Sequence, residues 1–129
     1  MSKENLTAAR ASKMGAVGRI YERIKLYPDP NQREGLRDAA NLAKTEAGGV
    51  GLEDDARIRN EVEIKKVKDR ISGKMADRRY NQAFAEGQGL IAMYAETIRF
   101  RSSAIANPEL VAARAFTKMI HYSEDLTLI

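Results

Sequence analysis

The chain has 129 residues, of which 43% are hydrophobic and 31% charged, and its formal net charge is +4 at pH 7. This length and composition predict one globular domain, residues 1–129, with a single hydrophobic core. The absence of cysteine excludes disulfides and thiol nucleophiles, and a single histidine excludes metal sites that need two imidazoles. No apolar run has the length of a membrane span, and the N-terminus lacks the apolar run of a signal peptide, so we expect an intracellular (cytoplasmic) or virion protein.

The charges alternate in blocks along the chain. Residues 1–26 carry six Lys/Arg and two Asp/Glu, residues 27–55 carry three and seven, and residues 56–80 carry nine and four. Blocks of opposite sign attract one another, either between neighbouring helices of one chain or head to tail between two copies. The sequence leaves both arrangements open. The basic blocks also leave open an interaction with nucleic acid, although a net charge of +4 is small for a nucleic-acid-binding protein.

A first amphipathic helix is predicted over residues 8–26. Its apolar positions recur at steps of three and four residues and are Val17, Ile20, Tyr21 and Ile24. Before about Met14 the apolar pattern is weak and glycines lower the helix propensity, so we expect residues 1–13 to be frayed. Pro28 and Pro30 end the helix, because neither can continue a helical hydrogen-bond pattern.

A second helix is predicted over residues 31–47, with two alternative starts. Either Asp29 caps it with Pro30 in the first helical position, or Asn31 caps it with Glu34 in a capping box. Its inward face is small and rich in alanine, so the helix buries little area and depends on neighbouring helices. The glycine-rich residues 48–51 that follow are predicted to be a hinge or an exposed loop.

A third helix is predicted over residues 54–76. Acidic residues at its start complement the helix dipole, and its apolar stripe consists of Ile64, Val67, Ile71 and Met75. Basic side chains flank this stripe on both sides, as in a helix that faces the core and extends long charged side chains along its edges. The alternative is a phosphate-binding surface, for which the candidate nucleic-acid residues are Arg59, Lys66, Arg70 and Lys74.

The strongest pattern in the sequence predicts a long fourth helix over about 78–104. Apolar and small residues alternate at steps of four and three, in a heptad-type seam that continues through Arg101 to Ile105. The alternative is that the pair Gly87 and Gly89 breaks the helix in two. We expect the seam to be a core or an interface, and the candidate interface residues are Tyr80, Phe84, Gly87, Ile91, Tyr94 and Ile98.

A fifth helix is predicted over residues 108–122, because Asn107 followed by Pro108 and Glu109 is a strong helix start. Residues 123–129 are predicted to be an extended C-terminal tail. Its apolar residues either fold back on the same chain or bind another subunit. On the second alternative they join the candidate interface as Leu126, Leu128 and Ile129.

These patterns together predict an all-α fold of four to five helices, a helical bundle built on one long scaffold helix. The sequence contains no phosphate-cradling loop, no dinucleotide fingerprint and no serine-hydrolase motif, so we expect no enzyme, no cofactor, no metal and no small-molecule substrate. The leading hypothesis is a non-enzymatic structural or assembly protein that forms a homo-oligomer or binds other protein subunits. The alternative is a small basic nucleic-acid-binding accessory or regulatory protein.

In its size, its helix-rich pattern and its apolar end, the chain resembles small virion or assembly proteins of bacteriophages. The resemblance is one of general features and rests on no shared motif. It implies a virion component that acts through protein–protein contacts.

Overall fold

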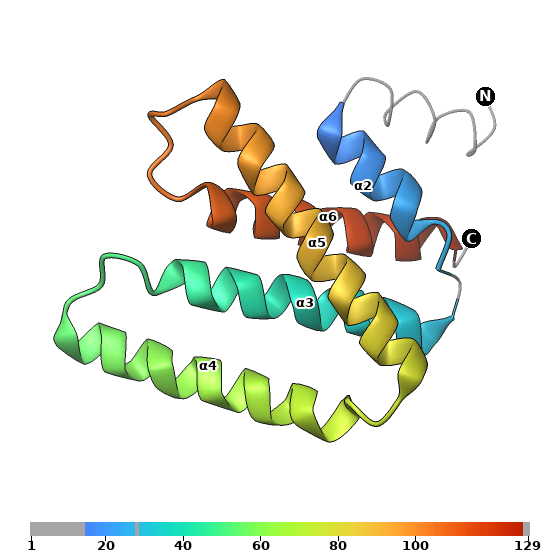
Figure 1. The fold of residues 1–129 in the computed structure, drawn as a ribbon, viewed down its shortest axis with the longest axis horizontal. Coiled ribbons are helices and arrows are strands. Elements are labelled where there is room, and N and C mark those ends of the chain that lie inside the picture. The colour runs from blue at the N-terminus through green and yellow to red at the C-terminus, as the bar shows by residue number, and fades with distance from the viewer. Residues whose placement is uncertain (1–14, 28, 128–129) are drawn as a thin grey trace.

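The computed structural model describes residues 15–27 and 29–127, and within that part of the chain it has five helices and no strand (Figure 1). The side chains of residues 16, 17 and 125–127 are outside this description. The predicted all-α fold is confirmed. The helices are α2 (Ala16–Ile24), α3 (Pro30–Gly48), α4 (Asp54–Lys74), α5 (Arg78–Arg101) and α6 (Pro108–Thr127).

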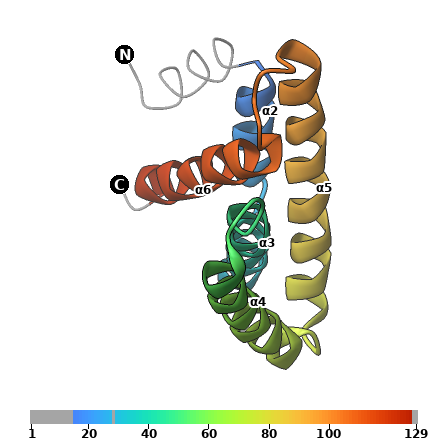
Figure 2. The same cartoon turned by 90° about the vertical axis from the view of Figure 1, so that its left-hand side faces the viewer.

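The long helix α5 organises the bundle. With 24 residues it is the longest of the five helices, and it packs against α3, α6 and α2. Figure 1 shows α5 crossing α3 obliquely, while Figure 2 shows it upright along one side of the molecule with the other helices on its opposite side. Helix α4 runs beside α3 and packs mainly against it. None of the five helices, over the described residues, combines the length and the apolar composition needed to cross a membrane.

Side-chain caps fix where three helices begin. Of the two starts predicted for α3, the structure has the first, because the Asp29 carboxylate accepts a hydrogen bond from the backbone N–H of Asn31 at 2.8 Å and Pro30 is the first helical residue. The predicted cap of α6 is also present, with the Asn107 side-chain oxygen accepting from the Leu110 N–H at 3.2 Å. Asp77 caps α5 in the same manner, which the sequence analysis did not predict. Each cap satisfies an N–H group that has no partner within its helix.

The main core forms where α2, α3, α5 and α6 meet. Its largest fully buried side chains come from α2, α3 and α6 and are Ile20, Ile24, Leu36, Phe116 and Ile120. Helix α5 adds the buried side chains of Ala83, Leu90, Ile91, Ala95 and Ile98. A second, smaller apolar cluster joins α4 to the bundle and consists of Leu42, Val67, Ile71 and Tyr80. Because α4 contributes only two fully buried side chains, most of its surface faces solvent.

Helices α3 and α5 approach each other closely at two glycines. A Cβ atom added to Gly35 of α3 would lie 2.6 Å from the backbone carbonyl oxygen of Tyr80, and one added to Gly87 of α5 would lie 2.8 Å from the Cβ atom of Ala39. Real Cβ atoms do not approach other atoms so closely, so only glycine, which has no Cβ atom, fits at each position. Helix α5 runs through Gly87 and Gly89 without a break, because packing against α3 offsets the low helix propensity of these residues.

The observed helix ends correct two predictions. Helix α5 ends at Arg101, not at residue 104, and Ser102 has extended dihedral angles, so Ile105 lies in the α5–α6 loop and not on the seam. Residues 123–127 belong to α6 and are not an extended tail. The helix continues there because Ser123 is buried and Glu124 forms an ion pair with Arg37 of α3.

The remaining segment predictions have mixed outcomes. Gly48, the first residue of the predicted loop at 48–51, is the last residue of α3, and the chain turns through residues 49–51, where Gly51 has a φ of 79° that favours glycine. The expected fraying of residues 1–13 concerns a segment outside the described residues. The same holds for Leu128 and Ile129, and of Leu126 only the backbone, within α6, is described.

Candidate functional site

The seam predicted as a candidate interface faces the core of its own chain. Tyr80, Ile91 and Ile98 expose 2%, 4% and 8% of their surface, and Gly87 is also buried. Phe84 and Tyr94 are half-buried and pack against the main core. Of the two alternatives, a core or an interface, the structure has the core, so the candidate interface assignment is corrected. Heptad spacing identifies residues on one face of a helix, and α2, α3 and α6 of the same chain cover that face.

The basic residues of the nucleic-acid alternative do not form one free surface. All four residues are on α4. Lys74 is half-buried beside α3, and the exposed residues are Arg59, Lys66 and Arg70. Lys74 and Arg70 both form ion pairs with Asp38, and Lys66 pairs with Glu63. Three of the four cations are thus already near a carboxylate, which lowers the positive potential that they offer to a phosphate.

The buried Asp38 of α3 is the centre of a polar network that joins three helices. Its carboxylate, in a residue only 6% exposed, accepts hydrogen bonds from the Tyr80 hydroxyl of α5 at 2.6 Å and from the Lys74 ammonium of α4 at 2.9 Å. Lys74 also donates to Glu34 at 2.6 Å. A buried carboxylate is tolerated only when it is paired and hydrogen-bonded in this way. The network therefore holds α4 and α5 in a fixed position on α3.

The network shifts the pKa values of its members. Burial, the hydrogen bond to Asp38 and the negative charges of Asp38 and Glu34 together raise the pKa of the Tyr80 hydroxyl above its usual value. For Lys74, burial by itself lowers the pKa of the ammonium, but the hydrogen bonds to Glu34 and Asp38 outweigh it, so this pKa is also raised. Both groups hold their protons more tightly in the folded chain than in the unfolded one.

We expect this network to make the protein less stable at alkaline pH. Because the folded-state pKa values of Tyr80 and Lys74 are raised, the stability that they confer is complete below about pH 10 and is lost as the pH rises beyond it. Urea unfolding at about pH 9 and about pH 11 measures the loss. The free energy of unfolding of the Tyr80→Phe variant should fall less over this interval than that of the natural chain, and an equal fall in both would contradict the role assigned to Tyr80.

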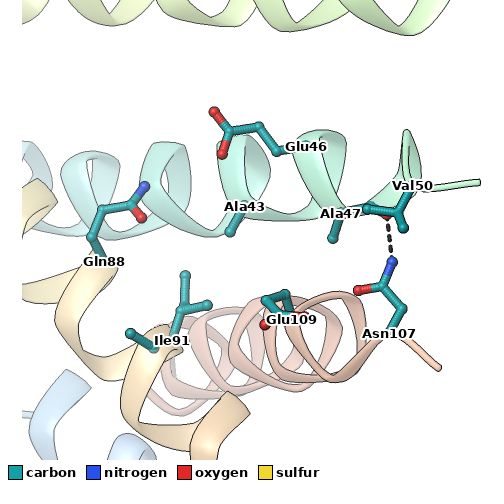
Figure 3. Close-up of a pocket in the computed structure, with 9 residues that line it drawn as sticks. Ala43, Glu46, Ala47, Val50, Gln88, Ile91, Asn107 and Glu109 are labelled. Atoms are coloured by element: carbon teal, nitrogen blue, oxygen red, sulfur yellow. Dashed lines mark hydrogen bonds between the residues drawn. The ribbon is translucent and has the colours of Figure 1, made fainter. Parts of the chain in front are cut away.

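A pocket of about 320 Å³ opens between α3, α5 and α6 (Figure 3). Its apolar wall consists of the side chains of Ala43, Ala47, Val50, Ile91 and Ala92. The polar residues of the lining are Glu46, Gln88, Asn107 and Glu109. Figure 3 shows the Glu46 carboxylate on the opposite side of α3 from the other labelled side chains. This size, with apolar lining and a few polar groups, is within the range of ligand-binding pockets in proteins.

The pocket follows from the helix crossing and from the alanines of α3. Beyond their close contact at Gly35 and Gly87, α3 and α5 separate, as Figure 1 shows. Ala43 and Ala47 then present only methyl groups to the widening space. Asn107 bridges its far side, because its side-chain amide donates a hydrogen bond to the carbonyl oxygen of Ala47, drawn as a dashed line in Figure 3.

The polar groups at the pocket give it an acidic rim. Glu109 forms an ion pair with Arg99 of α5, and Glu46 forms a looser one with Lys68 of α4 at 3.6 Å. Both carboxylates are about half exposed. The lining contains no histidine, serine or lysine that could act as a nucleophile or base. Both carboxylates are therefore already paired with a cation of the same chain.

The surface also carries apolar side chains that the sequence analysis did not single out. The most prominent is Phe100 in the last turn of α5, which exposes 94% of its surface. It lies two residues from Ile98, so it is turned away from the buried seam, and the charged Arg99 and Arg101 flank it. Local hydrophobicity is low at such a position, and no periodic signal marks it.

Among the described residues, no group of three or more His, Asp or Glu side chains is arranged to hold a metal ion. The features with chemical character are therefore the alanine-lined pocket, its acidic rim and the exposed Phe100. Comparisons of the chain with models of protein families, with curated proteins and with solved structures found no match.

Proposed function

We propose that this chain is a non-enzymatic helical protein that acts by assembling with copies of itself or with other protein subunits. The observation that carries the proposal is the exposure of Phe100: a large aromatic side chain is 94% exposed in the last turn of the longest helix. Aromatic side chains contribute much of the binding energy at protein interfaces, so an aromatic ring exposed to this extent supports the proposal.

Further apolar side chains accompany Phe100. Met93, seven residues earlier on the same helix and close to the same face, is 45% exposed, and Ile105 in the following loop is 38% exposed. The core is complete without these three side chains, since α2, α3 and α6 already cover the opposite face of α5. The exposed apolar side chains of α5 thus lie away from the seam that the sequence analysis named as the candidate interface.

The setting that this proposal favours is a particle or complex built of repeated subunits, as in the small bacteriophage virion proteins that the chain resembles in size and helix content. Nucleic-acid binding remains the second candidate on charge alone. It has less support, because three of its four candidate residues form ion pairs within the chain. A phosphate-binding protein requires such cations to be free.

Sedimentation velocity and light scattering of the natural chain from low to high micromolar concentration test the proposal. We expect an average mass above that of one chain, rising with concentration. A strict monomer over the whole range would contradict self-assembly. Titration with duplex DNA at two salt concentrations tests the second candidate, since binding through several phosphates weakens by orders of magnitude as salt rises.

A further inference from the structure

We infer that α4 opens away from α3 as one unit and closes again while the main core stays folded, and that the polar network around Asp38 holds α4 in the closed position. Opening exposes the apolar side chains that α4 covers, which include Leu42 of α3 and Tyr80 of α5. The inference goes beyond the proposed assembly function and does not depend on it. Helix α4 is then a movable cover on one side of α3.

The apolar contact that attaches α4 is small. Its only buried side chains are Val67 and Ile71, and both belong to the C-terminal half of the helix. In the N-terminal half, Ile58 and Val62 are 53% and 48% exposed. Each of the other described helices has more buried side chains. Because burial of an apolar face stabilises most helices in proteins, α4 is the described helix with the weakest support from the rest of the fold.

The main core does not include α4. All of its buried side chains come from α2, α3, α5 and α6. Figures 1 and 2 show α4 on the opposite side of α3 from α6, and its packing is mainly against α3. Opening of α4 therefore breaks the second apolar cluster and leaves the main core in place. Segments with few buried apolar contacts are those that open locally in folded proteins.

The polar network supplies further contacts at the C-terminal end of α4. Lys74 donates hydrogen bonds to Glu34 and Asp38, and Arg70 lies 3.5 Å from the Asp38 carboxylate. When α4 opens, the charges on both sides enter water, and hydration replaces part of the attraction that they lose. The network thus favours the closed position without making it permanent.

The segments on either side of α4 allow it to open without disturbing α3 or α5. Before it, the chain turns through residues 49–51, and Gly51 has a positive φ. After it, Asp77 caps α5 with its own side chain, so the start of α5 does not depend on α4. The Asn60 amide donates to the carbonyl oxygen of Thr45 at 2.9 Å and joins the N-terminal half of α4 to α3. Away from α3, a single helix is marginally stable in water, so opening includes the loss of hydrogen bonds within α4.

Native-state hydrogen exchange of the full chain, followed by NMR for individual amides, tests the inference. We expect the amides of residues 60–71 in α4 to be at least roughly tenfold less protected than those of residues 87–95 in α5. Urea below the unfolding transition should accelerate exchange less steeply in α4 than in α5, because opening of one helix exposes less surface than unfolding of the whole chain. Equal protection and equal urea dependence in the two helices would overturn the inference.

Lys74→Met tests the role of the network, since it removes the ammonium and keeps an unbranched apolar side chain. The Asp38 carboxylate, in a residue 6% exposed, then loses a charged partner in the closed form but is hydrated in the open form. We expect exchange in α4 to become faster by at least roughly tenfold. Unchanged exchange in α4 would show that the network does not hold this helix closed.

Ile120→Val is the matched control, because it removes one methyl group from the main core, which is the same whether α4 is open or closed. Exchange in α5 should become roughly two- to tenfold faster, the usual effect of this substitution in a core, while exchange in α4 stays as in the natural chain. A chain that opens only as a whole would show the same acceleration in both helices, and that result would overturn the inference.

Discussion

Replacing Asp38 with alanine is expected to lower the free energy of unfolding by about 3–5 kcal/mol, the usual cost of removing one partner from a buried ion pair. Without the carboxylate, the half-buried Lys74 ammonium keeps only Glu34 as an acceptor, and the Tyr80 hydroxyl, in a residue 2% exposed, loses its acceptor. The Tyr80 hydroxyl is then buried without an acceptor, and the Lys74 ammonium has one carboxylate acceptor in place of two. Urea denaturation followed by circular dichroism measures the change.

Asp69→Ala is the control for this experiment. Asp69 forms an ion pair with Lys65 on the outer face of α4 at 3.2 Å, but both side chains are largely exposed. Exposed pairs between residues four apart on a helix contribute about 0.3–0.5 kcal/mol, so this variant should be almost as stable as the natural chain. Similar losses of the free energy of unfolding in both variants would contradict the larger contribution assigned to the buried Asp38.

Replacing Gly35 with alanine is expected to lower the free energy of unfolding by roughly 1–3 kcal/mol, the typical cost of overpacking a core. The added Cβ would lie 2.6 Å from the carbonyl oxygen of Tyr80 and 3.0 Å from the backbone nitrogen of Phe84. Because these are backbone atoms of a continuous helix, they cannot rotate away as a side chain can. The two helices have to move apart, and the main core loses contacts.

Gly89→Ala is the matched control, because Gly89 is also inside a helix but has no atom within 4 Å of an added Cβ. Alanine is more favourable than glycine in a helix by about 1 kcal/mol, so this variant should be more stable than the natural chain. The two glycine variants should therefore change the free energy of unfolding in opposite directions. A shift of the same sign in both would contradict the close approach at Gly35.

Helix positions could be predicted from the sequence because local signals determine them. Pro30 after Asp29 and Pro108 after Asn107 mark the starts of α3 and α6, and the glycine run from Gly48 marks the end of α3. The ends that were wrong depend on tertiary contacts. Residues 123–127 are helical because α6 binds α3 there, which no local pattern shows.

What covers each helical face could not be predicted, since periodicity relates residues within one helix and not between helices. The seam from Tyr80 to Ile98 was correctly assigned to one face, but the same spacing suits an internal core and an interface equally well. Asp38 carried no signal either. Its burial arises because α4 and α5 bring Lys74 and Tyr80 to it from 36 and 42 residues away in sequence.

The pocket and Phe100 illustrate a related limit. The alanines of α3 were recognised as a small inward face that buries little area, but the sequence did not indicate that their methyl groups would line a pocket. Whether a small residue allows contact or leaves space depends on the crossing point, which the sequence alone does not locate. Phe100 lies between charged residues, where its exposure depends on the path of the loop after Arg101.

The close approach of α3 and α5 at Gly35 and Gly87 has a consequence for the pocket beside Ala43. Helices α3 and α5 approach closely where Gly35 lies against the α5 backbone and Gly87 lies against the Ala39 methyl group. A small tilt of α5 about this contact would change the distance between the two helices several turns away. The width of the hollow beside Ala43 is then governed by residues that do not line it. A substitution at Gly35 or Gly87 would thus alter both the free energy of unfolding and the width of the pocket.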